Sequence, residues 1–328
     1  MRKSTKNALI SIIGASFIAV QTPMAAYADV ETDNEIRVNI RIEGISECLY
    51  YDDVIYLANS ETAAAAEIIK FADIYSDDIE ISWTHSDYGD YISAVNGEME
   101  GAFGGWEGWQ YMVNGESPAV GVSACEIKSG DEIVIYYGDS YGVGMQYPVP
   151  VYDYADGTLT LTSLDLSYDA DWNPIETENP VTGVKIELYG DETYILETDE
   201  NGCADLAAAG VEPGNYKLSY SKYAENGIPM ILRPDPDCML EYGYILGDVD
   251  NSGGIDALDA SMVLTAYANT ATSKPSELDA AQELSANVCD DAAIDALDAS
   301  VILSYYAYSA TGGQASLHEY LSASAEME

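Results

Sequence analysis

Near its C-terminus the chain has a run of acidic residues with the spacing of a calcium-binding loop. The stretch reads GDVDNSGGIDALDAS, in which Asp248, Asp250 and Ser252 hold positions 1, 3 and 5 of a twelve-residue loop. Asp256 and Asp259 hold positions 9 and 12. A hard divalent cation takes six to eight oxygen ligands at about 2.3–2.6 Å, and side chains at alternate loop positions can converge on one centre. The spacing therefore predicts a Ca²⁺ site.

The residues between these acids agree with that prediction. Gly253 at position 6 permits the sharp turn that brings the ligands around one ion, and Gly254 at position 7 offers its carbonyl oxygen. Ile255 at position 8 is the apolar residue that would dock the loop on the fold. The alternative interpretation is a solvated acidic turn that caps the next helix, where the carboxylate of Asp259 would favour the helix dipole.

The seven residues IDALDAS recur 39 positions later in a second, poorer loop, ANVCDDAAIDALDAS. Its positions 1, 3, 5, 6, 7, 9 and 12 are Asn287, Cys289, Asp291, Ala292, Ala293, Asp295 and Asp298. A thiol is a poor ligand for a hard ion. Alanine at position 6 costs about 1 kcal/mol if its φ is positive. The sequence therefore predicts one good calcium site and one degraded site.

Each loop runs into a stretch with the apolar spacing of a helix, SMVLTAYA after the first and SVILSYYAY after the second. Four apolar positions recur at the same offset: Leu258, Met262, Val263 and Tyr267, then Leu297, Val301, Ile302 and Tyr306. One apolar stripe per helix is what packing two such units together requires, so we expect these residues to form a core.

A duplicated loop–helix unit that opens with G-D-V-D resembles a dockerin module of type I, here over residues 244–313. The resemblance implies binding to a cohesin module of a scaffoldin, and so attachment to a cellulosome. In this family loop positions 10 and 11 help to select the cohesin. They correspond here to Ala257 and Leu258 in the first repeat and to Ala296 and Leu297 in the second. Both pairs imply an apolar patch on the partner, although the leucines could instead belong to the module's own core. Because the repeats match, the resemblance also suggests docking in two orientations.

Residues 29–146 are predicted to form an α+β domain. The stretch EIRVNIRIE alternates apolar and polar residues as a strand does, and TAAAAEIIKFADIY (62–75) indicates a helix with Ser60 or Thr62 as its cap. Two Asn-Gly pairs, in AVNGEM and MVNGES, indicate hairpin turns. With the stretch GGWEGWQYMVNGESPAVGVSACEIKSGDEIVIYY, these elements resemble the domain related to the C-terminal part of transcobalamin. Transcobalamins close that domain over cobalamin with a helical domain that this chain lacks, so cobalamin binding is not expected.

Three aromatic residues of that domain, Trp106, Trp109 and Tyr111, lie close together in GGWEGWQY. Aromatic faces stack on sugar rings, so these residues are candidates for binding a polysaccharide. The alternative is that they pack the sheet.

Residues 147–243 are predicted to form a β-sandwich of the immunoglobulin or prealbumin type. Short alternating runs such as TLTLTSLDLS, GVKIELYG and NYKLSYSKY follow one another without a helical period. The order PVTGVKIEL, TDENG and GNYKLSY resembles the prealbumin-like repeats of bacterial surface proteins. Some of those repeats carry a Lys–Asn isopeptide bond, but Lys185 is expected to be an ordinary solvated lysine.

The two ends of the chain carry no predicted domain. MRKSTKN and the apolar ALISIIGASFIAV indicate a signal peptide over residues 1–28, and residues 314–328 are expected to be a tail. Of the 12 basic residues three lie in that leader, so residues 29–328 carry 57 acids against nine bases, a net charge of −48. Such a charge disfavours nucleic acids and anionic membranes as partners.

The sequence does not decide whether the five cysteines form disulfides. Cys48 with Cys125 and Cys203 with Cys238 could form disulfides in an exported protein, with Cys289 left over. Free, buried thiols are an equally good interpretation.

The sequence contains none of the common motifs of nucleotide-binding proteins or zinc metalloproteases: no P-loop, G-x-G-x-x-G or H-E-x-x-H. The segments before residue 244 are also too short for a glycosidase barrel of about 250 residues. We therefore predict a secreted, non-catalytic cellulosome component with an α+β domain, a β-sandwich and a small all-α, EF-hand-like module that binds Ca²⁺. A carbohydrate-binding protein is the first alternative. A cryptic polysaccharide or peptide hydrolase is the second, because acidic residues are plentiful.

Overall fold

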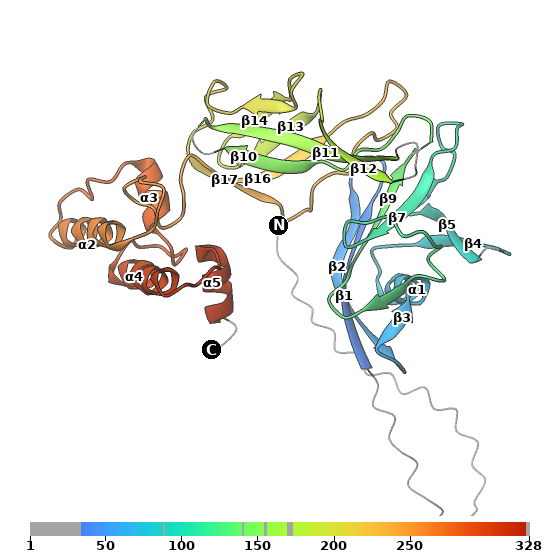
Figure 1. Cartoon of the computed structure of the whole chain (residues 1–328), viewed down its shortest axis with the longest axis horizontal. Coiled ribbons are helices and arrows are strands. Elements are labelled where there is room, and N and C mark those ends of the chain that lie inside the picture. Colours follow the sequence, from blue (N-terminus) through green and yellow to red (C-terminus); the bar gives the residue numbers. More distant parts are fainter. Residues whose placement is uncertain (1–33, 88, 140, 154–155, 169–172, 326–328) are drawn as a thin grey trace, which may run out of the picture.

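The structure is a computed structural model that describes residues 34–325 apart from 88, 140, 154–155 and 169–172 (Figure 1). The predicted signal peptide lies outside the described residues. The described chain has several domains, built mostly of β-sheets and with five helices. Among the described helices, none combines the length and the apolar character needed to cross a bilayer.

The N-terminal unit is built on a four-stranded sheet with strand order β2-β1-β9-β7. Its elements are β1 (Asn34–Glu43), β2 (Cys48–Ala58), β3 (Thr62–Ala64), α1 (Ala65–Tyr75), β4 (Ile81–Ser86), β5 (Gly89–Val95), β6 (Glu98–Met99), β7 (Gly108–Val113), β8 (Glu126–Lys128) and β9 (Glu132–Gly138). The alternation predicted for the first strand is confirmed, because Ile36, Val38, Ile40 and Ile42 are all buried. Both Asn-Gly pairs have positive φ at both residues, as hairpin turns require.

Helix α1 packs on this core but begins three residues later than the sequence predicts. Thr62 and the two residues after it pair with β8 instead, and no side chain caps the helix. The backbone N–H groups of Ala65 and Ala66 donate to the carbonyl oxygens of Cys125 and Val122. The cap predicted at Ser60 or Thr62 is therefore wrong, because a distant loop satisfies the first turn of the helix.

The middle unit places two sheets around one apolar core. Its strands are β10 (Val149–Asp153), β11 (Thr158–Tyr168), β12 (Pro174–Pro180), β13 (Lys185–Tyr189), β14 (Thr193–Glu197), β15 (Cys203–Asp205), β16 (Gly214–Ser221) and β17 (Met239–Tyr242). One sheet has the order β10-β11-β12 with β15 on β11, and the other has the order β14-β13-β16-β17. Leu159 and Leu161 from the first sheet meet Ile186, Leu188 and Leu218 from the second in the core. Lys185 pairs with Glu187, as a solvated lysine does.

The N-terminal and middle units are joined by a buried contact. Met112, Val134 and Tyr136 of the N-terminal sheet pack against Leu232 of the middle unit. Beside them, the guanidinium of Arg233 donates to a carboxylate oxygen of Glu43 at 2.9 and 2.7 Å. The two units therefore share a core and an ion pair.

The C-terminal unit contains four helices, α2 (Ala257–Ala271), α3 (Ala280–Ala286), α4 (Ala296–Ala310) and α5 (Leu317–Ala325). Helices α2 and α4 pack side by side, with Val263 and Ile302 at the centre of their core (Figure 1). Leu317 of α5 is buried in the same core, so the unit extends beyond residue 313, into the segment expected to be a tail.

All five cysteines are free thiols in the structure. Neither pairing considered from the sequence is formed there.

Candidate metal centre

Three of the predicted calcium ligands converge in the loop before α2. Asp248, Asp250 and Asp259 each offer a carboxylate oxygen, and these oxygens lie within 4.8 Å of one another. Asp248 and Asp259 are buried. Burying carboxylates this close together is unfavourable unless a cation or hydrogen-bond donors compensate their charge.

The backbone curls around Asp248 in the way that the glycine predicts. Asn251 and Gly253 have φ values of 54° and 85°, so the chain turns sharply at loop positions 4 and 6. This turn aims the N–H groups of Ser252 and Gly253 at the carboxylate of Asp248, at 2.9 and 2.8 Å. The left-handed conformation costs nothing at glycine, which explains its value at position 6.

Asp259 links the loop to the helix. Its carboxylate accepts hydrogen bonds from the N–H groups of Asp250 at 3.1 Å and Asp256 at 2.7 Å. Asp256 in turn accepts from the N–H groups of Leu258 and Asp259, and its reciprocal bonds with Asp259 form a capping box at the start of α2. Burial raises the pKa of Asp259 and repulsion from Asp250 adds to this, while the backbone donors act in the opposite direction. A cation beside Asp259 would relieve both unfavourable effects.

The remaining predicted ligands surround this cluster. The hydroxyl of Ser252 donates to the carbonyl oxygen of Gly254 at 3.2 Å, and both residues are exposed. Asp256 is engaged as the helix cap, and position 9 of such loops often reaches the ion through water. A set of three carboxylates with a hydroxyl and a carbonyl oxygen is the hard, oxygen-only donor set that suits Ca²⁺.

The second loop keeps the helix cap but not the cluster. Asp298 is buried and accepts from the N–H groups of Cys289 and Asp295, as Asp259 does in the first loop. The side-chain amide of Asn287, however, donates to the backbone carbonyl oxygen of Asp291 at 2.9 Å. Within the described part of the chain, only the first loop brings three acidic, thiol or imidazole ligands together.

The strain considered for Ala292 does not arise. The positive φ of this loop is at Asp290, with a value of 49°, and Ala292 lies outside the left-handed region. The N–H of Ala293 donates to Asp291 at 2.8 Å, so the chain takes a different path at positions 6 and 7. The second loop thus avoids strain by giving up the turn that gathers ligands.

Cys289 also fits a hard cation poorly. Burial raises the pKa of its thiol to about 11, and repulsion from Asp298 acts in the same direction. The thiol therefore keeps its proton at neutral pH, whereas a metal-binding cysteine must lose it.

The four residues at loop positions 10 and 11 are all on the surface. Ala257 and Ala296 are exposed, and the side chains of Leu258 and Leu297 are 62% and 57% exposed. The alternative that these leucines belong to the module's core is therefore wrong. They lie in the first turns of α2 and α4, where the capping boxes turn the buried aspartates inward.

Two other residues of the expected core stripe also face outward. Val263 and Ile302 are buried as predicted, and Met262 and Val301 are half-buried. Tyr267 and Tyr306, in contrast, are exposed. Only part of each predicted stripe therefore contributes to the core.

The aromatic trio of the N-terminal unit is not brought together as a sugar-binding surface. Trp109 is buried, its indole N–H donates to the carbonyl oxygen of Glu98, and its ring stands edge-on to Tyr137. Tyr111 is half-buried, and its hydroxyl donates to the carbonyl oxygen of Val120. Only Trp106 is exposed. Trp109 and Tyr111 thus pack the sheet, which was the alternative left open by the sequence.

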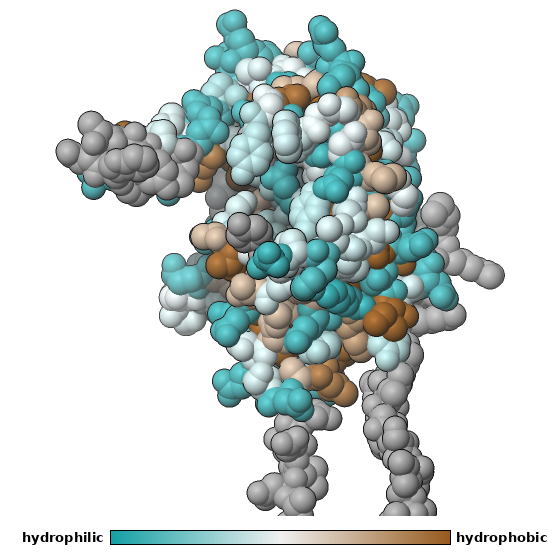
Figure 2. Space-filling model, turned by 90° about the vertical axis from the view of Figure 1, so that its right-hand side faces the viewer, coloured by the Kyte–Doolittle hydropathy of each residue, from teal (hydrophilic) through white to brown (hydrophobic). Residues whose placement is uncertain are grey.

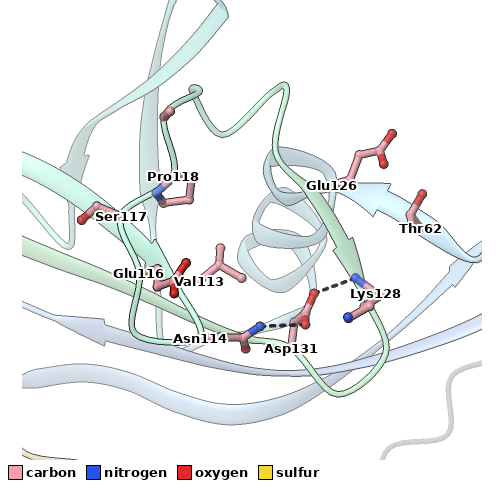
Figure 3. Close-up of a pocket in the computed structure, with 10 residues that line it drawn as sticks. Thr62, Val113, Asn114, Glu116, Ser117, Pro118, Glu126, Lys128 and Asp131 are labelled. Atoms are coloured by element: carbon pink, nitrogen blue, oxygen red, sulfur yellow. Dashed lines mark hydrogen bonds between the residues drawn. The ribbon is translucent and has the colours of Figure 1, made fainter. Parts of the chain in front are cut away.

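A shallow pocket of about 680 Å³ lies between the end of β7 and strands β3 and β8 (Figure 3). One of its lining residues, Asp131, accepts from the side-chain amide of Asn114 and from the N–H of Lys128, both at 2.9 Å. These bonds fasten the turn after β7 to the strand beside it. The carboxylate of Asp131 is therefore occupied in holding the fold.

A family model matches part of the N-terminal unit. No curated protein matches the chain. Among solved structures, haptocorrin in complex with Cbi has 17% identity and a TM-score of 0.28, covering 34% of this chain and 27% of haptocorrin. A candidate metal-binding protein from Ruminococcus gnavus ATCC 29149 has 12% identity and a TM-score of 0.25, covering 33% of this chain and 100% of that protein. Residues 71–139, inside the predicted α+β domain, match the family described as Domain of unknown function (DUF4430).

Proposed function

We propose that the C-terminal unit is a calcium-dependent docking module of the dockerin type. One Ca²⁺ would be held by Asp248, Asp250 and Asp259, with the hydroxyl of Ser252 and the carbonyl oxygen of Gly254 completing the site. The observation that carries the proposal is the convergence of three carboxylate oxygens within 4.8 Å at the start of α2. Bound calcium offsets their mutual repulsion and stabilises the first turn of the helix.

The docking surface would be the exposed apolar pairs at the starts of α2 and α4. Ala257 with Leu258, and Ala296 with Leu297, occupy equivalent places in two equivalent helices. Leu264 and Leu303 lie about two turns beyond Ala257 and Ala296 on the same side of each helix, and both are exposed. Exposed leucines repeated in this way favour a partner with a complementary apolar patch, and a cohesin module of a scaffoldin is the partner we propose.

Attachment to a scaffoldin implies a secreted chain that works in a cellulosome. The N-terminal and middle units are then the cargo, which binds a ligand or acts as a spacer. The proposal assigns no catalytic step to the chain.

Calcium-dependent capture of a cohesin tests the proposal. The full chain should bind immobilised cohesin from the same secretome in Ca²⁺ and be released by a chelator. Leu258→Ala and Leu297→Ala should each retain binding through the intact repeat, whereas the double variant should lose it. Leu164→Ala, which truncates an exposed leucine of β11, is the matched control and should bind normally.

Three outcomes would contradict parts of this proposal. Capture that survives chelation would remove the role of calcium, and failure to capture any cohesin would remove the proposed partner. Loss of binding in either single leucine variant would exclude docking in two orientations.

A further inference from the structure

Two aromatic side chains of the N-terminal unit are almost completely exposed. Trp106 is 91% exposed and Tyr141 is 94% exposed, the two largest values among the exposed large hydrophobic residues that the structure describes. Burying a large aromatic ring is favourable, so leaving one in water forgoes that free energy. The other tryptophans of the N-terminal unit are at least partly covered. Both rings are therefore placed where a ligand could cover them.

The two rings project from neighbouring loops. Strands β7 and β9 pair in antiparallel fashion, and Gly108 at the start of β7 lies opposite Gly138 at the end of β9. Trp106 comes just before Gly108 and Tyr141 just after Gly138. The loops that carry them thus leave the same end of the sheet from adjacent strands, next to the middle unit (Figure 1).

The loop of Trp106 is held rigidly from inside the protein. The carboxylate of Glu107 is buried and accepts from the N–H groups of Phe103 and Gly105, one on each oxygen. The hydroxyl of Tyr137 accepts from the N–H of Ala102 at 3.2 Å. These bonds fasten the backbone on both sides of a ring that itself contacts little.

The loop of Tyr141 is built in the same way. The buried carboxylate of Asp139 accepts from the N–H groups of Tyr141, Gly142 and Val143, at 3.2, 2.8 and 3.2 Å. Each loop is thus anchored by a buried carboxylate, while the aromatic side chain of the loop is exposed. A surface held in place before binding loses little conformational entropy when a ligand arrives.

We propose that Trp106 and Tyr141 form a platform that binds the sugar rings of a neutral polysaccharide. Planar amphipathic rings present one apolar face to the C–H face of a sugar while the edges stay in water. The surface of two rings is far smaller than the roughly 800 Å² that each partner buries in a stable protein interface, so the two rings alone do not suit a protein partner. On the face of the molecule seen in Figure 2, apolar residues form separate patches among polar ones.

Charge favours a neutral ligand over an ionic one. The net charge of the whole chain is −45, which repels anionic polysaccharides. The carboxylates that anchor the two loops, Glu107 and Asp139, direct their oxygens at backbone N–H groups and so offer little to a cation. This platform differs from the trio suggested by the sequence, because it keeps Trp106 and replaces two packed residues by Tyr141.

Binding of the full chain to defined polysaccharides tests the proposal. Depletion on cellulose and affinity electrophoresis in xylan and hydroxyethylcellulose measure neutral ligands, while polygalacturonate and oligolysine serve as the anionic and cationic probes. A chelator in every buffer removes any contribution of the calcium loop. Trp106→Ala and Tyr141→Ala should each weaken binding by about tenfold, and Trp106→Phe should retain most of it.

Matched controls separate binding from folding. Tyr189→Ala truncates a tyrosine of β13 that is also exposed, and it should bind as the unaltered chain does. The Trp106 and Tyr141 variants should melt within about 2 °C of that chain, because neither ring packs in the core. The proposal is overturned if no neutral polysaccharide binds, if only polygalacturonate or oligolysine binds, or if both alanine variants bind neutral polysaccharide as tightly as the Tyr189→Ala control.

Discussion

The buried arginine that joins the first two units allows a sharp prediction about stability. The guanidinium of Arg233 donates twice to Glu43, once each to the carbonyl oxygens of Ile45 and Gly44, and once to the hydroxyl of Tyr223. The side chains of Arg233 and Glu43 are only 12% and 4% exposed. Replacing Arg233 by methionine keeps much of the apolar stem and removes all five hydrogen bonds.

The loss should be large because Glu43 would remain buried without its main partner. Its other cation, Arg41, is 3.6 Å away, and neither Glu43 Oε1 nor Arg41 Nε has a hydrogen-bond partner. Removing one member of a buried ion pair typically costs about 3–5 kcal/mol. For a cooperative unit of this size, 1 kcal/mol lowers Tm by about 2–4 °C, so Arg233→Met should lower Tm by about 10 °C.

The chain contains a matched control for this experiment. Arg37 and Glu35 form an ion pair at 2.7 Å, the same distance as Arg233 and Glu43, but their side chains are 63% and 55% exposed. Arg37→Met should change the free energy of unfolding by less than about 0.5 kcal/mol. Arg233→Lys keeps the charge without the planar fork, so it should recover only part of the loss.

Differential scanning calorimetry of the four proteins checks the reasoning. The unaltered chain should unfold the N-terminal and middle units in one transition, and Arg233→Met should lower that transition or split it in two. If Arg233→Met and Arg37→Met lower Tm by the same small amount, burial does not decide the value of these ion pairs. If the unaltered chain already unfolds the two units separately, the contact does not couple them.

Three further predictions concern single sites. Asp259→Asn should abolish calcium binding in a calorimetric titration that finds one site in the unaltered chain. Asp298→Asn changes the equivalent residue of the second capping box and should leave the stoichiometry unchanged. Two tight sites of equal affinity would contradict this prediction. Burial, and then repulsion from Glu43, raise the pKa of Cys48 to about 12, so the folded chain keeps a proton that the unfolded chain loses above about pH 8.5. Its contribution to stability is therefore lost as pH rises from about 9 towards 12, and Cys48→Ala should weaken the fall in the urea midpoint between pH 8 and pH 10.5. Trp109→Ala should destabilise the N-terminal unit by about 3–5 kcal/mol in urea unfolding, since its indole is part of the core; an unchanged midpoint would be incompatible with its burial.

Much of the local structure could be predicted from the residues alone. The alternation of the first strand, the Asn-Gly turns and the sharp turn at Gly253 all appear where the sequence indicates them. The difference between the two calcium loops also follows from their own residues, because Asp248 and Asp250 are replaced by Asn287 and Cys289. Each of these features depends on residues within about a dozen positions, where backbone geometry and side-chain chemistry leave few alternatives.

The tertiary structure decided which of these residues are covered. Trp109 is buried because its strand pairs with β9, opposite Tyr137, while Trp106 remains free in the loop before it. Leu258 is 62% exposed although it recurs in the helical pattern of the core. The sequence alone thus determined the local conformations and the ligands that could meet in one loop. Burial, and with it the choice between core and binding surface, depends on contacts such as Arg233 with Glu43, 190 residues apart, which no local pattern specifies.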